Sequence, residues 1–154
     1  MEVEAAILHG ESLFTYRVIG GPVFVPPAAS PARTDGLWQT TCFELFVMPA
    51  GGEGYFEFNF SPSTAWTAYR FDGYREGMAD LPLAPPRIEP VEGGVRVAFD
   101  LGGLPGGDWM VGITAAIEEA DGTKSYWALR HPSAQPDFHH PGCFAFELPA
   151  PDAS

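Results

Sequence analysis

The sequence has 154 residues, of which 45% are hydrophobic and 14% aromatic, so we expect one domain over residues 1–149 and a short tail at 150–154. A net charge of −12, with eight lysines and arginines, argues against binding to nucleic acids or anionic membrane surfaces. No apolar run approaches the length of a membrane span, and no signal peptide is evident, so we expect a cytoplasmic protein.

Glycines and prolines fall mainly between short runs of β-branched and aromatic residues, which is typical of an all-β protein. The first two runs, 3–8 and 13–19, are expected to form a hairpin. A short apolar run at 23–25 precedes a proline-rich linker. Trp38 follows this linker at the entrance of the next strand, where it either contacts a ligand or plugs the end of a sandwich.

Three consecutive strands are predicted at 41–48, 55–60 and 65–71, and their short connections predict antiparallel pairing. Side chains alternate between the two faces of a strand. We expect the phenylalanines of the second strand to face the core. The opposite face is then expected to gather a polar and aromatic set: Glu44, Glu57, Asn59, Trp66 and Arg70.

This predicted set supplies hydrogen-bond donors, acceptors and a flat apolar ring on one face, which suits a ligand-binding surface. The alternative is an ordinary solvated face of an antiparallel sheet, on which glutamate and arginine form a cross-strand pair. The two carboxylates, Glu44 and Glu57, would also satisfy the need of a glycosidase for paired acids if they lay close enough.

The second half of the chain continues the pattern of strands and turns. Residues 72–86 are expected to form a long loop that covers one face or one end of the sheet. Residues 87–92 and 95–101 predict a hairpin. Further strands are expected at 109–118, at 125–130, which carries Trp127, and at 143–148. About ten or eleven strands at this spacing predict an antiparallel β-sandwich.

Three of the four histidines lie close together near the end of the chain, with one aspartate: His131, Asp137, His139 and His140. Imidazole and carboxylate groups can hold a transition metal, and a carboxylate can orient a histidine base. Their spacing matches no metal signature, so no metal is predicted. The alternative is a structural loop in which Asp137 caps a turn and a histidine hydrogen-bonds the backbone.

Nucleophilic hydrolysis finds little support in the sequence. There is no G-x-S-x-G motif. Cys42 and Cys143 are too few for a disulfide framework, and both are expected to be small buried residues with free thiols.

Three segments, LWQTTCFELFVMP, YFEFNFSPSTAWTAYRFDGYREGM and SYWALRHPSAQPDFHH, resemble the DOMON-like superfamily. The resemblance is strongest to small bacterial proteins, some of whose relatives are attached to a cell-wall reductase of the UDP-N-acetylenolpyruvoylglucosamine type. It spans roughly residues 3–148. Family 9 carbohydrate-binding modules share a tryptophan followed by an acidic residue in an aromatic strand, as Trp38 and Glu44 stand here.

The resemblance implies an immunoglobulin-like β-sandwich with a ligand site, and sugar or haem as ligand classes. Sugar-binding relatives stack the ligand between aromatic rings, a role open to Trp38, Trp66 or Trp127. Haem-binding relatives use methionine and histidine as axial ligands, and the available methionines are Met48, Met78 and Met110.

Three hypotheses follow, and the sequence names no cofactor. The leading one is a module that binds a small molecule, a carbohydrate or glycoconjugate. The second is a small enzyme that uses the histidine and aspartate cluster for acid–base or metal-assisted chemistry. Haem binding ranks third. An unpaired edge strand would also allow a homodimer.

Overall fold

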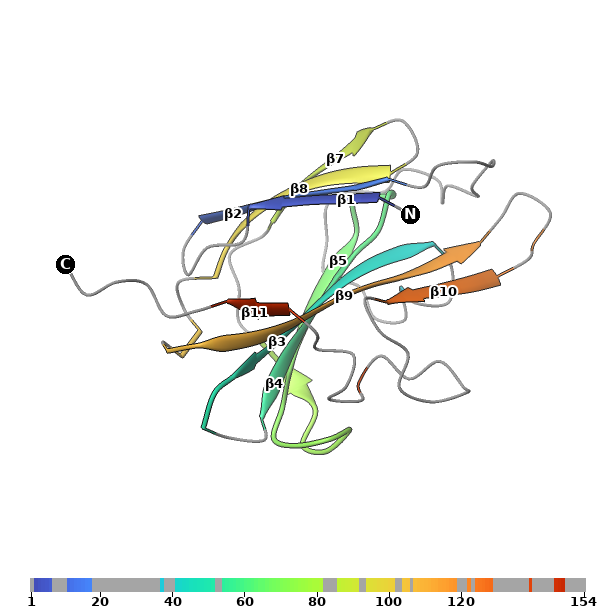
Figure 1. Ribbon diagram of the computed structural model, residues 1–154. Helices are drawn as coiled ribbons and strands as arrows, with labels where there is room; N and C mark the ends of the chain where they lie inside the picture. The colour runs from blue at the N-terminus through green and yellow to red at the C-terminus, as the bar shows by residue number, and fades with distance from the viewer. Residues whose placement is uncertain are drawn as a thin grey trace.

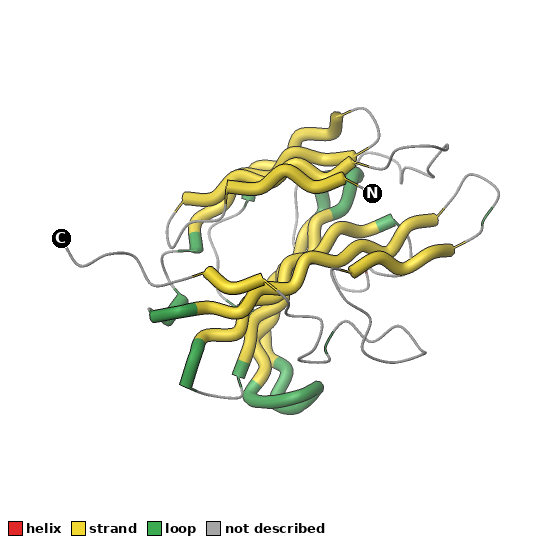
Figure 2. Tube along the Cα trace, viewed as in Figure 1, coloured by secondary structure: helices red, strands yellow, loops and turns green. Residues whose placement is uncertain are grey.

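The computed structural model describes residues 2–6, 11–17, 37, 41–51, 54–81, 86–91, 94–101, 104–105, 107–118, 122, 124–128, 139 and 146–148. For residues 2–6, 11, 17, 124–128 and 146–148 the description is of the backbone. These residues form strands and loops, as Figure 2 shows, and none of them belongs to a helix long and apolar enough to cross a membrane.

Strands make up the regular structure of this part of the chain. Their bounds are β1 (Glu2–Ala6), β2 (Glu11–Arg17), β3 (Cys42–Pro49), β4 (Tyr55–Phe60), β5 (Trp66–Phe71), β6 (Ala79–Asp80), β7 (Arg87–Val91), β8 (Gly94–Asp100), β9 (Trp109–Glu118), β10 (Lys124–Ala128) and β11 (Phe146–Leu148).

Two antiparallel sheets lie one above the other (Figure 1). The smaller sheet has the order β1-β2-β8-β7. The larger sheet has the order β10-β9-β3-β4-β5-β6. The short strand β11 also pairs with β9, antiparallel, at residues 109–111. The predicted all-β antiparallel sandwich is therefore confirmed, as are the hairpins β1–β2 and β7–β8 and the antiparallel central strands.

The strand prediction differs from the structure at one place, and two other predicted strands lie wholly or partly outside the described residues. Residues 79–80 pair with β5 as the short strand β6, although the sequence predicted a loop there. The predicted strand at 23–25 lies outside the described residues, and only residues 146–148 of the last predicted strand are described.

Aromatic side chains join the two sheets. Tyr16 of the smaller sheet packs against Phe43 of the larger one, with ring centroids 5.0 Å apart, and Phe99 packs against Phe60 at 5.1 Å. The Tyr16 hydroxyl also donates a hydrogen bond of 2.9 Å to the backbone oxygen of Glu44. Burial of these large rings, with the hydroxyl satisfied, fixes β3 against the smaller sheet.

Trp66 and Arg70 lie on the opposite side of the larger sheet from the one predicted. Phe60 pairs with Trp66 in the register of β4 and β5, and Phe56 pairs with Arg70. Directly paired residues of antiparallel strands point to the same side, so both follow the phenylalanines toward the smaller sheet. Trp66 is buried in the core between the sheets, and Arg70 is exposed.

Candidate functional site

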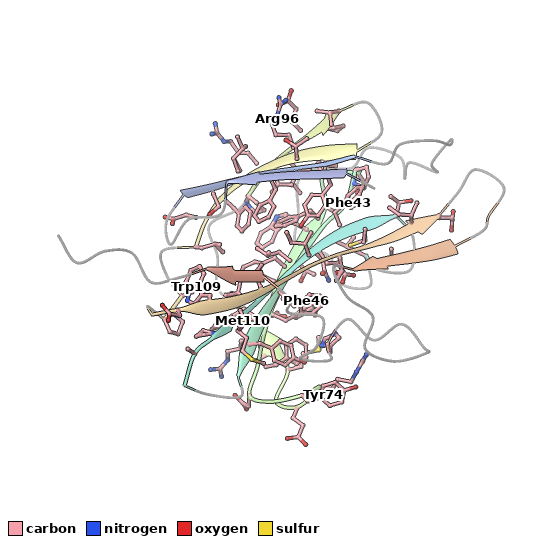
Figure 3. All side chains as sticks on the ribbon, in the orientation of Figure 1. Phe43, Phe46, Tyr74, Arg96, Trp109 and Met110 are labelled. Atoms are coloured by element: carbon pink, nitrogen blue, oxygen red, sulfur yellow. The ribbon has the colours of Figure 1, made fainter. Side chains whose placement is uncertain are left out.

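The larger sheet has one face toward the smaller sheet and a second face turned away from it, which we call the outer face. Figure 3 shows Phe43 between the sheets and Phe46, three residues later, on the other side of β3. The strand period places Glu44, Glu57 and Asn59 on the outer face with Phe46, as the sequence predicted.

A row of polar residues crosses the outer face over four neighbouring strands. In the register, Thr114 of β9 pairs with Glu44 of β3, Glu44 with Asn59 of β4, and Asn59 with Thr67 of β5. We call these four residues the polar row. Their exposed fractions are 0% for Thr114, 3% for Glu44, 2% for Asn59 and 0% for Thr67. An outer sandwich face is normally solvated, so this burial of polar groups is unusual.

Hydrogen bonding within the polar row is incomplete. The Thr114 hydroxyl donates to Glu44 Oε2 at 3.0 Å, and the Asn59 side chain lowers the pKa of the neighbouring Glu57 carboxyl. Asn59 Oδ1 and Thr67 Oγ1 are buried and have no hydrogen-bond partner in the described part of the chain. Buried polar atoms of folded proteins are nearly always hydrogen-bonded to protein, water or ligand. These two atoms are therefore available to hydrogen-bond a water molecule or a polar ligand.

Aromatic rings lie beside the polar row on the same face. Phe46, Tyr55, Tyr69 and Phe71 form one buried cluster, against which the half-buried Met48 packs. Glu57 pairs with Phe46 on one side and Tyr69 on the other, so its carboxyl group emerges between aromatic residues. The outer face thus combines carboxyl and amide groups with buried aromatic rings.

His139 closes the aromatic side of this arrangement. Its ring lies edge-on to Phe46, Tyr55 and Phe71, with centroid distances of 5.1, 5.7 and 5.0 Å. The Tyr55 hydroxyl is 2.8 Å from His139 Nδ1, and His139 Nε2 is 3.8 Å from Glu57 Oε2. The side chains of His139 and Glu57 are 16% and 9% exposed, so solvent reaches the site at this end.

The turn between β5 and β6 orients Tyr55. The Arg75 backbone N–H donates to the Tyr55 hydroxyl at 3.0 Å, and Arg75 has a positive φ of 53°. Because the hydroxyl accepts this bond, its own proton is available for His139 Nδ1. Neutral His139 then carries its proton on Nε2, which faces Glu57.

The two carboxyl groups of the outer face hold protons unusually tightly. Burial raises the pKa of Glu44 from 4.5 to about 7, against the effect of the Thr114 hydrogen bond. Burial, and then the charge of Glu44, raise the pKa of Glu57 to about 8, against the effects of Asn59 and Arg75. The pair therefore retains a proton near neutral pH that free carboxyl groups would lose.

Cys42 lies on the same strand as Glu44 and is buried against Leu37 and Ala65. Burial, followed by the charges of Glu44 and Glu57, raises the pKa of its thiol well above the usual value. Cys42 is a free, buried thiol, as predicted, and its environment disfavours a thiolate nucleophile. Cys143 lies outside the described residues.

Of the residues predicted to bind a ligand, the structure brings together Glu44, Glu57 and Asn59, and joins His139 from the predicted histidine cluster to them. Trp38, His131, Asp137 and His140 lie outside the described residues, and Trp127 is described by its backbone in β10. Met78 and Met110 are exposed. The described residues contain no group of three metal-ligating side chains that could hold a metal ion.

Sequence reasoning missed Tyr55, Thr67 and Thr114 as members of the site. Tyr55 shares the outer face with Glu57 by strand alternation, but its contact with His139 joins residues 84 positions apart. Thr114 reaches Glu44 because β9 pairs with β3 across 70 positions, and no local signal predicts that pairing. Thr67 could have been found from the register of the β4–β5 hairpin.

No protein-family model and no curated protein matches the chain. Among solved structures, it is similar to the crystal structure of a "putative carbohydrate-binding protein" from Bacteroides uniformis ATCC 8492. The TM-score is 0.65, with 18% sequence identity over 96% of this chain and 76% of that chain. The two proteins share a fold. At this identity the likeness carries no residue of the site from one protein to the other.

Proposed function

We propose that the outer face of the larger sheet binds a small carbohydrate or a glycoconjugate. The observation that carries this proposal is the pair of buried, unpartnered atoms, Asn59 Oδ1 and Thr67 Oγ1, in a row with the buried Glu44 carboxyl. Leaving a buried polar group without a hydrogen bond costs roughly 1–3 kcal/mol, which a ligand hydroxyl would remove.

The neighbouring aromatic cluster suits the other half of a sugar. A pyranose presents hydroxyls at its edge and C–H groups on its faces, so it needs acceptors beside flat apolar surface. The polar row supplies the first, and Phe46, Tyr69 and Phe71 supply the second. Aromatic packing of this kind contributes on the order of 1 kcal/mol per ring.

Two likenesses support a carbohydrate as the ligand. The structural neighbour is named for carbohydrate binding, and the sequence resembles the DOMON-like superfamily, to which we propose that this chain belongs. Both are analogies at the level of the fold, whereas the polar row is an observation on this chain.

A thermal-shift panel of neutral monosaccharides and disaccharides tests the proposal. A ligand that binds only the folded state raises the melting temperature. We expect at least one sugar to raise the melting temperature. Thr67→Val should reduce this shift, because it should weaken the affinity for the sugar about tenfold, which corresponds to about 1.4 kcal/mol. Thr15→Val, the same substitution in the smaller sheet, should leave the shift unchanged. Equal binding by the two variants, or no shift with any sugar, would contradict the proposal.

Acid–base catalysis is a second candidate function, because Tyr55, His139 and Glu57 form a chain of proton-exchanging groups at the solvent-reached end of the site. A positioned histidine beside a carboxyl with a raised pKa is typical of proton transfer in enzymes. Proton NMR of each bound sugar before and after incubation tests this candidate. Conversion that His139→Gln abolishes would favour an enzyme, and unchanged sugar would favour a binding module.

A further inference from the structure

The free hydrogen-bonding capacity of the outer face consists mainly of acceptors. Glu44 and Glu57 carry carboxyl oxygens, and Asn59 Oδ1 lacks a partner among the described residues. The Thr114 hydroxyl already donates to Glu44, which leaves the Thr67 hydroxyl as the unpartnered donor of the polar row in the part of the chain that the structure describes. A ligand that satisfies this face must therefore bring more donors than acceptors.

The positive charges of the described arginines lie mostly away from the polar row. Arg70 is exposed on the side of β5 that follows Phe56 and Phe58. Arg96 lies on β8 of the smaller sheet, 3.5 Å from Glu89. Arg75 lowers the pKa of Glu57, but its guanidinium carbon lies over the Tyr74 ring, 5.8 Å from the centroid.

Glu44 and Glu57 are diagonal neighbours on β3 and β4, and two buried carboxyl groups placed in this way favour a cation between them. Either carboxylate alone is costly to desolvate, and the two repel each other when both are ionised. A primary ammonium group would neutralise the pair and supply three N–H donors with no acceptor.

We propose that the ligand of the outer face is an amino sugar with a free primary amine, whose ammonium group binds between Glu44 and Glu57. This inference rests on the proposed function and narrows it. The ring and hydroxyls would occupy the aromatic cluster and the unpartnered atoms of Asn59 and Thr67. Neutral sugars should bind more weakly, and sugar phosphates and uronic acids should be rejected by the carboxyl pair.

Binding of a cation should also expel the proton that the carboxyl pair holds. Among the described residues, the titratable groups that face Glu44 and Glu57 are Cys42 on β3, Tyr55 on β4 and Tyr69 on β5, with Arg75 and His139 from the loops. Burial keeps the Cys42 thiol protonated, so the proton released to solvent should come from the two glutamates. Affinity for an amine should rise from pH 5 to about pH 7, the range in which an amine with a pKa of about 7.7 stays mostly protonated.

Isothermal titration calorimetry of the full chain with five probes tests the inference: glucosamine, N-acetylglucosamine, glucose, glucosamine 6-phosphate and 2-aminoethanol. We expect glucosamine to bind at least tenfold more tightly than each of the others. Its binding enthalpy should vary with the ionisation enthalpy of the buffer, which reports proton release. Glu57→Gln keeps the side-chain shape and should lose this preference, whereas Glu89→Gln in the smaller sheet should keep it.

The outcomes separate the two proposals. Glucose that binds as tightly as glucosamine would overturn the inference and leave the proposed carbohydrate site standing. Equally tight 2-aminoethanol would overturn it too, because the ring would then contribute nothing. Absence of binding by every sugar would overturn the proposed function itself. If Glu57→Gln fails to fold, the pH dependence and proton release of the unchanged protein decide the question.

Discussion

Glu57 is the residue whose environment departs most from that of an ordinary carboxyl group. Its pKa is raised from 4.5 in a free carboxyl to about 8 by burial and by Glu44. Between these values the folded protein holds a proton that the unfolded chain has released. The free energy of unfolding should therefore fall as the pH rises from about 4.5 to about 8, and level off above that range.

The substitution Glu57→Gln should remove the part of this pH dependence that comes from Glu57, leaving the smaller part that Glu44 contributes between about pH 4.5 and 7. We expect the variant to be more stable than the original protein by roughly 1–3 kcal/mol at pH 8.5, because no buried charge forms, and nearly equal at pH 5. Urea denaturation at the two pH values measures both differences. Equal destabilisation at pH 5 and pH 8.5 would show that Glu57 is a satisfied structural group.

A substitution at Thr67 tests whether the polar row contributes to ligand binding or to the stability of the fold. Its hydroxyl is fully buried without a partner in the described part of the chain, so Thr67→Val should stabilise the ligand-free protein by about 1 kcal/mol.

Thr41 provides the matched comparison for Thr67. Its hydroxyl accepts a hydrogen bond from the Glu118 N–H at 3.1 Å and lies 3.4 Å from the Glu118 backbone oxygen. Thr41→Val should therefore destabilise the protein by about 1 kcal/mol, the opposite sign. Thermal denaturation of both variants measures the contrast. Destabilisation by Thr67→Val would mean that its hydroxyl is bonded in solution, for example to an ordered water.

At the scale of the elements, Tyr16 ties β2 of the smaller sheet to β3, the strand that carries Glu44. Its buried hydroxyl donates to the Glu44 backbone oxygen directly behind the site. Burial and the charges of Glu44 and Cys42 raise the pKa of Tyr16, so the hydroxyl stays protonated and remains a donor.

Tyr16→Phe should destabilise the fold by roughly 1–2 kcal/mol, since it leaves a buried carbonyl oxygen without this partner. Denaturant unfolding measures the loss, and the exposed Tyr74→Phe serves as the control. Because the bond fixes β3 rather than the side chain of Glu44, ligand affinity should change less than stability does. A large loss of affinity at unchanged stability would contradict this structural role.

At the scale of the whole molecule, local patterns predicted the strands and turns well. The runs at 55–60 and 95–101 became β4 and β8 with nearly the same bounds, because β-branched and aromatic alternation is a local property. The face of β5 was predicted wrongly, since the register of Trp66 against Phe60 depends on the geometry of the connecting turn.

The placement of the candidate-site side chains was predicted where it depends on a single hairpin and missed where it depends on distant pairing. Glu44, Glu57 and Asn59 share a face because β3 and β4 are neighbours in sequence. Thr114 joins them through β9, and His139 reaches Glu57 from a segment more than 80 positions away. Such contacts follow from the strand order of the sandwich, which no short window of sequence contains.

The central claim, that a sugar binds on the outer face of the larger sheet, can be tested directly at Asn59. It is the only asparagine of the chain, and the only glutamines are Gln39 and Gln135, so the side-chain amides give very few NMR signals. Titration of ¹⁵N-labelled protein with glucosamine should shift the Asn59 amide pair in proportion to saturation, and Thr67→Val should weaken that response. If the two Asn59 side-chain amide signals keep their chemical shifts while the sugar binds, the claim is contradicted and the sugar binds elsewhere on the molecule.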